Sequence, residues 1–340
     1  MTVLVLRALG LGDLLTGVPA LRGIRRAFPD DHVVLATPAE LAALAYATGA
    51  VDEVLPARGL ASPDIAFTPD IAVNLHGRGP QSHRLLSELR PGRLLGFRCP
   101  EAGYVDGPRW VRGEYEVARW CRMLAGHGIE ARPEDLGLPA PASPRPGCVV
   151  VHPGAAHLRR RWPAERFALV AAALANAGED VVVSGSAAEV DRAREVADRA
   201  GLPRSAVFAG CTDVLALAGL VACARLVICG DTGVAHLASA FATPSVVLFG
   251  PVSPAEWGPP PGRARHVALW PAAADGHVTG AGDDAVDDGA VDSVLLATGA
   301  EEVLAAAERL LATQEAVTQE AVTQEARPST VPGLSSAPVR

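Results

Sequence analysis

The stretch VLRALGLGDLLTGVPALRGI, residues 5–24, joins two kinds of sequence pattern. An apolar run opens it, glycines stand at positions 10 and 12, and the residues that follow have the apolar spacing of an amphipathic helix. A strand that passes through a glycine-rich turn into a helix is the first unit of a doubly wound α/β domain. In such a domain the turn lies at the carboxyl end of the strand, where ligands bind.

The same alternation of apolar runs and helix-like segments fills most of the chain. Strand-length apolar runs recur at 3–7, 32–37, 71–77 and 93–97 in the first half, and at 148–154, 180–186, 206–210, 226–230 and 245–250 in the second half. Continuous apolar strands separated by helices predict parallel sheets that are covered on both faces. The sequence therefore predicts two α/β domains with a ligand-binding cleft between them.

A proline-rich run, LPAPASPRPG at 138–147, separates the two halves, because it cannot continue a helix or a central strand. We expect an N-terminal domain over residues 1–140, a linker over 141–147 and a C-terminal domain over 148–312.

Two segments of the second half lack these patterns. Residues 271–293 are rich in Gly and Asp and have the composition of a long loop. Residues 313–340 begin with TQEAV repeats, which could extend the last helix, and continue with Pro, Ser and Thr. We expect much of this low-complexity tail to be disordered.

Composition and charge limit the classes of function. The 340 residues are 49% hydrophobic and carry a net charge of −8, which argues against a nucleic-acid partner. Six cysteines show no zinc-like spacing, so we expect reduced, mostly buried thiols. Met1 leads directly into an apolar strand without the pattern of a signal peptide, and no apolar run reaches the roughly 18 residues of a membrane helix. We expect a cytoplasmic protein that can touch the inner face of the membrane.

Asp13 follows the two glycines at the start of the first predicted helix. A carboxylate at this position can cap free N–H groups and complement the helix dipole, which stabilises a helix by about 1 kcal/mol. The same carboxylate, held at a strand end, could act as a general base. The spacing alone leaves both roles open. A dinucleotide fingerprint is excluded, because Leu15 occupies the position of its third glycine.

Two strand-end turns in the second half are candidate anion sites. HPGAAHLRRRWP, residues 152–163, places a run of arginines between a strand end and a predicted helix. ICGDTGVAHLASA, residues 228–240, starts a helix with small residues that leave backbone N–H groups open to a diphosphate. The alternatives are a solvated basic loop for the first turn and simple helix capping for the second.

These motifs together resemble glycosyltransferase family 9, the ADP-heptose:lipopolysaccharide heptosyltransferase family. Four segments carry the resemblance in order over about residues 2–257: VLVLRALGLGDLLTGVPALRGIRRAFP, VVVHPGAAHLRRRWPAERFALVAAAL, VVVSGSAAEVDRA and CGDTGVAHLASAFATPSVVLFGPVSP. The resemblance implies the GT-B fold, in which two Rossmann-like, doubly wound parallel-sheet domains face a central cleft. The donor would lie mainly on the C-terminal domain and the acceptor on the N-terminal domain.

The resemblance also implies an activity. The protein would be an inverting, metal-independent glycosyltransferase. It would move a sugar, in this family a heptose, from a nucleotide-diphosphate sugar such as ADP-heptose to a hydroxyl of a glycan or glycolipid in cell-envelope biosynthesis. No cofactor and no metal are implied, and we expect a monomer.

The resemblance carries over to individual residues. The base of the family's GD turn corresponds to Asp13. Arg160 stands two residues before the WP pair, where a basic residue, commonly Lys, meets the diphosphate; Arg keeps the charge but changes the donor geometry. The other expected donor contacts are Arg159, Asp231, Thr232, Gly233, His236 and Gly154. The expected acceptor side comprises Gly12, His76, Arg78 and Ser82, which equally suit an exposed loop.

Two other functions remain open at this point. A nucleotide-sugar epimerase of the same fold would turn over the donor without an acceptor. A non-catalytic nucleotide-sugar binding protein would bind the donor and release no diphosphate.

Overall fold

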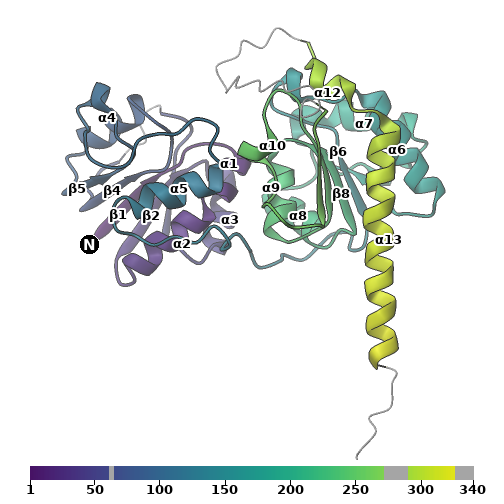
Figure 1. Cartoon of the computed structure of the whole chain (residues 1–340), viewed down its shortest axis with the longest axis horizontal. Helices are drawn as coiled ribbons and strands as arrows, with labels where there is room; N and C mark the ends of the chain where they lie inside the picture. The colour runs from purple at the N-terminus through teal and green to yellow at the C-terminus, as the bar shows by residue number, and fades with distance from the viewer. Residues whose placement is uncertain (61–64, 272–289, 326–340) are drawn as a thin grey trace, which may run out of the picture.

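A computed structural model describes residues 1–60, 65–271 and 290–325 of the chain. These residues form two parallel sheets of five strands each, with helices packed around both sheets (Figure 1). The expected α/β class with two doubly wound domains is confirmed. All six cysteines are free thiols, and four of them are buried.

The first sheet has the strand order β3-β2-β1-β4-β5, with every neighbouring pair parallel. Its strands are β1 (Thr2–Leu6), β2 (His32–Thr37), β3 (Glu53–Pro56), β4 (Ile71–Asn74) and β5 (Arg93–Leu95). Its helices are α1 (Leu11–Thr16), α2 (Val18–Ala27), α3 (Ala42–Ala47), α4 (Gln81–Glu88) and α5 (Glu116–Ala125), with short 3₁₀ turns η1 (Ala39–Leu41) and η2 (Pro100–Ala102).

The second sheet has the order β10-β9-β8-β6-β7 and is also parallel throughout. Its strands are β6 (Val149–His152), β7 (Val181–Val183), β8 (Leu226–Gly230), β9 (Ser245–Leu248) and β10 (His266–Leu269). Its helices are α6 (Ala164–Asn176), α7 (Val190–Arg199), α8 (Val214–Ala222), α9 (Gly233–Ala240), α10 (Pro254–Trp257), α12 (Ser293–Ala297) and α13 (Ala300–Glu325), with turns η3 (Leu158–Arg160), η4 (Ala187–Glu189) and η5 (Arg204–Ala206).

Alternate residues of the central strands point to opposite faces, and both faces are buried. In β1, Val3 and Val5 join one apolar cluster, whereas Leu4 and Leu6 join another. In β6, Val150 joins the cluster that also contains β1 side chains, while its neighbours on either side belong to a separate cluster. This two-sided burial explains why the strands read as continuous apolar runs.

Each sheet reverses its direction of winding at one point. In the first sheet the reversal lies between β1 and β4, and in the second between β6 and β8. The carboxyl ends of the strands on either side of such a reversal form the usual ligand site of an open α/β sheet. The three turns singled out in the sequence follow β1, β6 and β8.

Some sequence predictions need correction. The run AVFAG at 206–210 was expected as a strand but forms only an isolated bridge between Val207 and Val183 after the turn η5. The edge strands β3 and β10 were not predicted. The single helix expected after the glycine-rich turn is broken at Gly17 into α1 and α2.

In the C-terminal region the TQEAV repeats extend the last helix, the alternative that the sequence left open beside a disordered tail. The helix α13 continues through the TQEAV repeats to Glu325, so residues 313–325 are helical (Figure 1). Residues 326–340, and residues 272–289 of the expected 271–293 loop, lie outside the described residues. No helix in the described part of the chain is both long and apolar enough to cross a membrane.

Candidate active site

The two domains meet where α1 of the first contacts α9 of the second. The contact is close because both helices carry glycine there. A Cβ atom on Gly233 would stand 2.8 Å from Cβ of Leu11, and one on Gly12 would stand 2.8 Å from Cδ2 of His236. The contact therefore brings the GD turn of the first domain close to the DTG turn of the second.

Asp13 lies in the first turn of α1, with about a quarter of its side chain exposed to solvent. Its Oδ2 accepts a hydrogen bond from the Gly10 N–H at 3.2 Å, so the capping role considered from the sequence is present. Its Oδ1 lies 3.9 Å from Nη2 of Arg7. The carboxylate is therefore fixed by the helix start on one side and faces a buried cation on the other.

On the side where the donor was expected, Arg160 in the turn η3 reaches the start of α9. Its Nη1 lies 3.3 Å from Oδ2 of Asp231, which is buried. Thr232 is the N-cap of α9 and Gly233 its first residue, so the open N–H groups of this helix start beside the Arg160–Asp231 pair. A guanidinium and a helix N-terminus at one place form a strong anion site.

Arg159 points to a different partner. Nη2 of Arg159 lies 3.0 Å from Oδ2 of Asp292, and the backbone carbonyl of Arg159 accepts a hydrogen bond from the N–H of Asp292. Of the two arginines expected to meet the donor, Arg160 is the one paired at the start of α9.

Gly154 follows β6 and leaves room for a carboxylate that the sequence analysis did not single out. A Cβ on Gly154 would collide with the carboxylate of Glu189. Burial opposes ionisation of this group, but hydrogen bonds from the N–H and hydroxyl of Ser186, together with the charges of His152 and Arg161, lower the pKa of Glu189. Nearby, Nδ1 of the buried His152 lies 3.0 Å from the Ser184 hydroxyl. The spacing S-x-x-E at 186–189 was the available signal for Glu189, since it is that of a capping box.

Two histidines predicted for the site are both held neutral at pH 7. Burial, with a contribution from the charge of Arg7, lowers the pKa of His236 to about 4 and that of His76 to about 4. His236 packs its ring edge-on to Trp257, with the ring centroids 5.9 Å apart. Among the described residues, Nδ1 of His76 is buried without a hydrogen-bond partner. Arg7 is thus the common electrostatic neighbour of both histidines and of Asp13.

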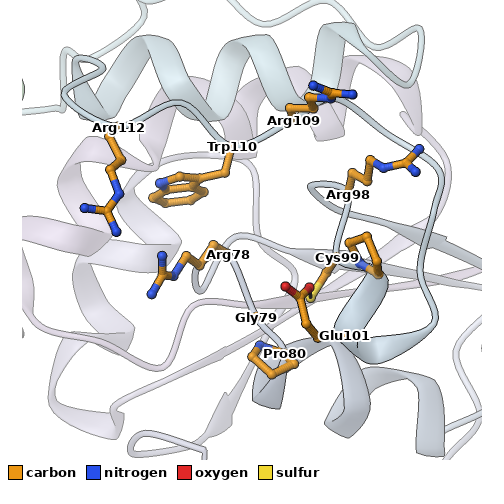
Figure 2. Close-up of a pocket in the computed structure, with 10 residues that line it drawn as sticks. Arg78, Gly79, Pro80, Arg98, Cys99, Glu101, Arg109, Trp110 and Arg112 are labelled. Carbon is orange, nitrogen blue, oxygen red and sulfur yellow. Dashed lines mark hydrogen bonds between the residues drawn. The ribbon is translucent and has the colours of Figure 1, made fainter.

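A cavity of about 540 Å³ opens on the first domain near Arg78 (Figure 2). Figure 2 shows the guanidinium groups of Arg78 and Arg112 pointing toward one another beside the ring of Trp110. The cavity is lined by Arg78, Gly79, Pro80, Arg98, Cys99, Pro100, Glu101, Arg109, Trp110 and Arg112. Within residues 1–60, 65–271 and 290–325, the guanidinium groups of Arg78, Arg109 and Arg112 have no ion-pair partner.

The other residues near this cavity have structural roles. Ser82, expected on the acceptor side, is buried and accepts a hydrogen bond from the Asn74 amide at 3.0 Å. Asn74 also contacts His83, whose Nε2 lies 2.8 Å from the carbonyl of Phe97. In the described part of the chain, no three His, Cys, Asp or Glu side chains are grouped so that they could hold a metal ion.

Comparison with known proteins gives one family and several relatives. Residues 132–276 match the family described as glycosyltransferase family 9 (heptosyltransferase). The chain is 32% identical over 113 residues to lipopolysaccharide heptosyltransferase 2 of Salmonella typhimurium, which covers 32% of each chain. It is 34% identical over 153 residues to lipopolysaccharide heptosyltransferase 1 of Pseudomonas aeruginosa, covering 42% of this chain and 41% of the relative. These alignments therefore span less than half of each curated relative.

The fold comparison extends over most of the chain. The solved structure of the E. coli ADP-heptose lipopolysaccharide heptosyltransferase II aligns with a TM-score of 0.72, covering 93% of this chain and 100% of that one at 20% identity. At this identity the likeness establishes the fold, which is the expected GT-B arrangement.

Proposed function

From the match of residues 132–276 to glycosyltransferase family 9, which confirms the resemblance seen in the sequence, we propose that this protein is an inverting glycosyltransferase. Its donor is a nucleoside-diphosphate sugar, and its acceptor is a hydroxyl of a glycan or glycolipid. The names of the curated relatives make heptose the first sugar and a lipopolysaccharide-type glycolipid the first acceptor to test.

The observation that carries the proposal is the contact between α1 and α9. It puts the turn that carries Asp13 against the start of α9, and this closeness supports a base on the first domain acting beside an anion site on the second. Such a pair is what a single displacement at an anomeric carbon requires.

The proposed reaction assigns a role to each of these groups. The acceptor oxygen attacks the anomeric carbon from the side of Asp13, and its proton passes to the Asp13 carboxylate. The bond from the anomeric carbon to the diphosphate oxygen breaks, and its electron pair leaves with the diphosphate. Arg160 and the N–H groups at the start of α9 stabilise the charge that develops there. A single displacement inverts the anomeric configuration, and these residues supply the charge stabilisation without a metal ion.

The neutral state of His236 fits the donor side of this proposal. A neutral imidazole at the interface can hydrogen-bond to a sugar hydroxyl without competing with Arg160 for the diphosphate. The Arg160–Asp231 contact orients the guanidinium before the donor arrives. When the donor binds, its phosphates would be a stronger anionic partner for Arg160 than the Asp231 carboxylate.

On the acceptor side, the cavity beside Arg78 supports an acceptor that carries phosphate or carboxylate groups. Arg78, Arg109 and Arg112 line it, and within the described residues these three side chains have no carboxylate partner. Unpaired like charges gathered in a protein of net charge −8 favour an anionic ligand.

A transfer assay with purified protein tests the proposal. The protein is incubated with ADP-heptose and a lipopolysaccharide-core acceptor, with and without a chelator, and the anomeric configuration of the product is read by NMR. We expect inverted product and unchanged turnover with the chelator. Turnover of the donor without an acceptor would indicate an epimerase. Donor binding without diphosphate release for any acceptor would indicate a binding protein.

A further inference from the structure

We propose that Arg7 is a positioning residue, which holds Asp13 in its ionised form and in the orientation needed to act as the base. The inference rests on the proposed function for the role of Asp13, but the contacts of Arg7 stand independently of it.

Arg7 follows β1 and is completely buried, which is rare for an arginine. Its guanidinium donates to the carbonyl oxygens of Asp13 and Leu75 and, at 2.9 Å, to the hydroxyl of Thr16. These acceptors come from α1 and from the end of β4, the two segments beside the reversal point of the first sheet. Arg7 therefore ties the turn that carries Asp13 to the neighbouring strand end.

The fold leaves space for this side chain. A Cβ on Gly17 would stand 2.8 Å from Nε and 2.9 Å from Cδ of Arg7, so the break between α1 and α2 is occupied by the arginine. The guanidinium also lies over the ring of Trp120, 4.8 Å from its centroid. A medium-sized apolar side chain could fill this space without the cost of burying a charge. The proposal gives this buried charge a role, which is to act on the Asp13 carboxylate.

The charges around Arg7 come from four elements. Asp13 on α1 lies 3.9 Å away and Glu116 on α5 lies 3.5 Å away, while Arg119 on α5 opposes the charge. His76, after β4, and His236 on α9 are the other titratable groups within its influence, and both are neutral at pH 7. Glu116 is itself shared, because it pairs with Arg119 and accepts a hydrogen bond from Trp120 Nε1 at 2.7 Å.

This arrangement divides one buried positive charge between two carboxylates. Glu116 is buried, whereas Asp13 is partly exposed. A cation at this distance favours the carboxylate form of Asp13, which is the form that can accept a proton. Glu116 interacts with the same guanidinium. Its negative charge therefore weakens the stabilisation that Arg7 gives to the Asp13 carboxylate.

The network also reaches the acceptor cavity. The Arg119 guanidinium, paired with Glu116, lies over the ring of Trp110 at 4.3 Å from its centroid, and Trp110 lines the cavity. One buried group of charges thus supports both the base and an aromatic wall of the acceptor side.

The test uses two variants that should shift the titration midpoint of Asp13 in opposite directions. In Arg7→Met the cation is gone, whereas in Glu116→Gln its competitor is gone and the Trp120 hydrogen bond can persist. The titration of Asp13 is followed by NMR of ¹³C-carboxyl-labelled aspartates, with Asp13→Asn used to assign its signal. We expect the midpoint to rise by about one pH unit in Arg7→Met and to fall in Glu116→Gln.

Two further measurements keep the inference falsifiable. Where Arg7→Met fails to fold, Glu116→Gln and the charge-conserving Arg7→Lys carry the test, and Arg7→Lys should keep the midpoint of the wild type. The acid limb of the pH profile of kcat/KM should move with the NMR midpoint in each variant. Arg25→Lys is the matched control, since Arg25 also binds backbone carbonyls but contacts Asp52 instead of the site.

The outcomes separate this inference from the proposed function. An unchanged Asp13 midpoint in a folded Arg7→Met, or in Glu116→Gln where Arg7→Met does not fold, would overturn the role of Arg7 whether or not the protein transfers sugar. If the Asp13 midpoint rises in Arg7→Met and falls in Glu116→Gln, but the protein transfers no sugar, the electrostatic role of Arg7 is upheld. Only the proposed function is then contradicted.

Discussion

Gly12 lies directly against the imidazole of His236. A Cβ at Gly12 would stand 2.8 Å from Cδ2 of His236 and 3.6 Å from Cα of Gly233, a spacing that leaves no room for a methyl group. The two residues belong to different domains, so the distance between the turn that carries Asp13 and the helix α9 depends on the absence of a side chain at Gly12.

The first prediction concerns this contact. Gly12→Ala should lower kcat/KM at least tenfold, because the added methyl group pushes α1 from α9, and misplacements of about 1 Å can cost roughly 100-fold in rate. The matched control is Gly299→Ala, where an added Cβ meets nothing within 4 Å. Steady-state kinetics on both variants make the comparison. Full activity in Gly12→Ala with an unchanged melting temperature would show that the close contact is not needed for catalysis.

The second prediction compares two neighbouring arginines. Arg160→Met should weaken donor binding by roughly 10- to 100-fold, since a charge-assisted hydrogen bond contributes about 1.5–3 kcal/mol. Arg159→Met should leave donor affinity nearly unchanged, because Arg159 pairs with Asp292. Isothermal titration with the nucleoside diphosphate measures both affinities. Equal losses in the two variants would contradict the assignment of the diphosphate contact to Arg160.

The third prediction addresses the acceptor cavity. Arg78→Ser and Arg112→Ser should each raise the KM for an anionic acceptor several-fold and leave the KM for the donor unchanged. The double variant should also lose much of the salt dependence of acceptor binding, since screening acts on the charges that were removed. Arg132→Ser, at an exposed ion pair with Glu130, is the control. Equal donor and acceptor effects would point to a general loss of structure.

The fourth prediction follows from the buried histidines. The pKa of His236 is about 4 in the folded protein, below its ordinary value of 6.5, so the unfolded state takes up a proton more readily as the pH falls. This group should therefore lower the free energy of unfolding between about pH 6.5 and pH 4, by roughly 2 kcal/mol at pH 5. Urea unfolding of the wild type and of His236→Gln across this range measures the effect. Parallel pH dependences of the two proteins would contradict it.

The sequence predicted the central strands well because they are buried on both faces. Val3 to Leu6 and Val149 to Val151 form continuous apolar runs, which are typical of interior strands in a parallel sheet. The edge strands were harder. Glu53–Pro56 carries an acid and a proline, and its residues are half-buried or exposed, so it resembles a loop. The run AVFAG is as apolar as a strand, but a single bridge to Val183 is all that it forms.

The candidate site was predictable where a residue type is unusual for its place in the chain. Asp13 in a glycine-rich turn and the arginine run before Trp162 both stand out in this way. Arg7 and Glu116 do not, because an arginine after a strand and a glutamate in an amphipathic helix are ordinary surface residues. Their burial depends on the contact between Arg7, which follows β1, and Glu116 on α5. The local sequence around either residue does not indicate this contact. The S-x-x-E spacing marks Glu189 only as a helix-capping residue, and its approach to Gly154 is a tertiary contact that this local pattern does not record.

Sugar transfer by Asp13→Asn is the decisive experiment for the role of this carboxylate. Asparagine keeps a side-chain oxygen that can accept the Gly10 N–H, so the capping contact can persist while the basic group is lost. We predict a protein that melts within a few degrees of the wild type, binds the donor with similar affinity and transfers sugar at least 1000-fold more slowly, a loss of about 4 kcal/mol in transition-state stabilisation. Transfer at the rate of the wild type would contradict the assignment of Asp13 as the base.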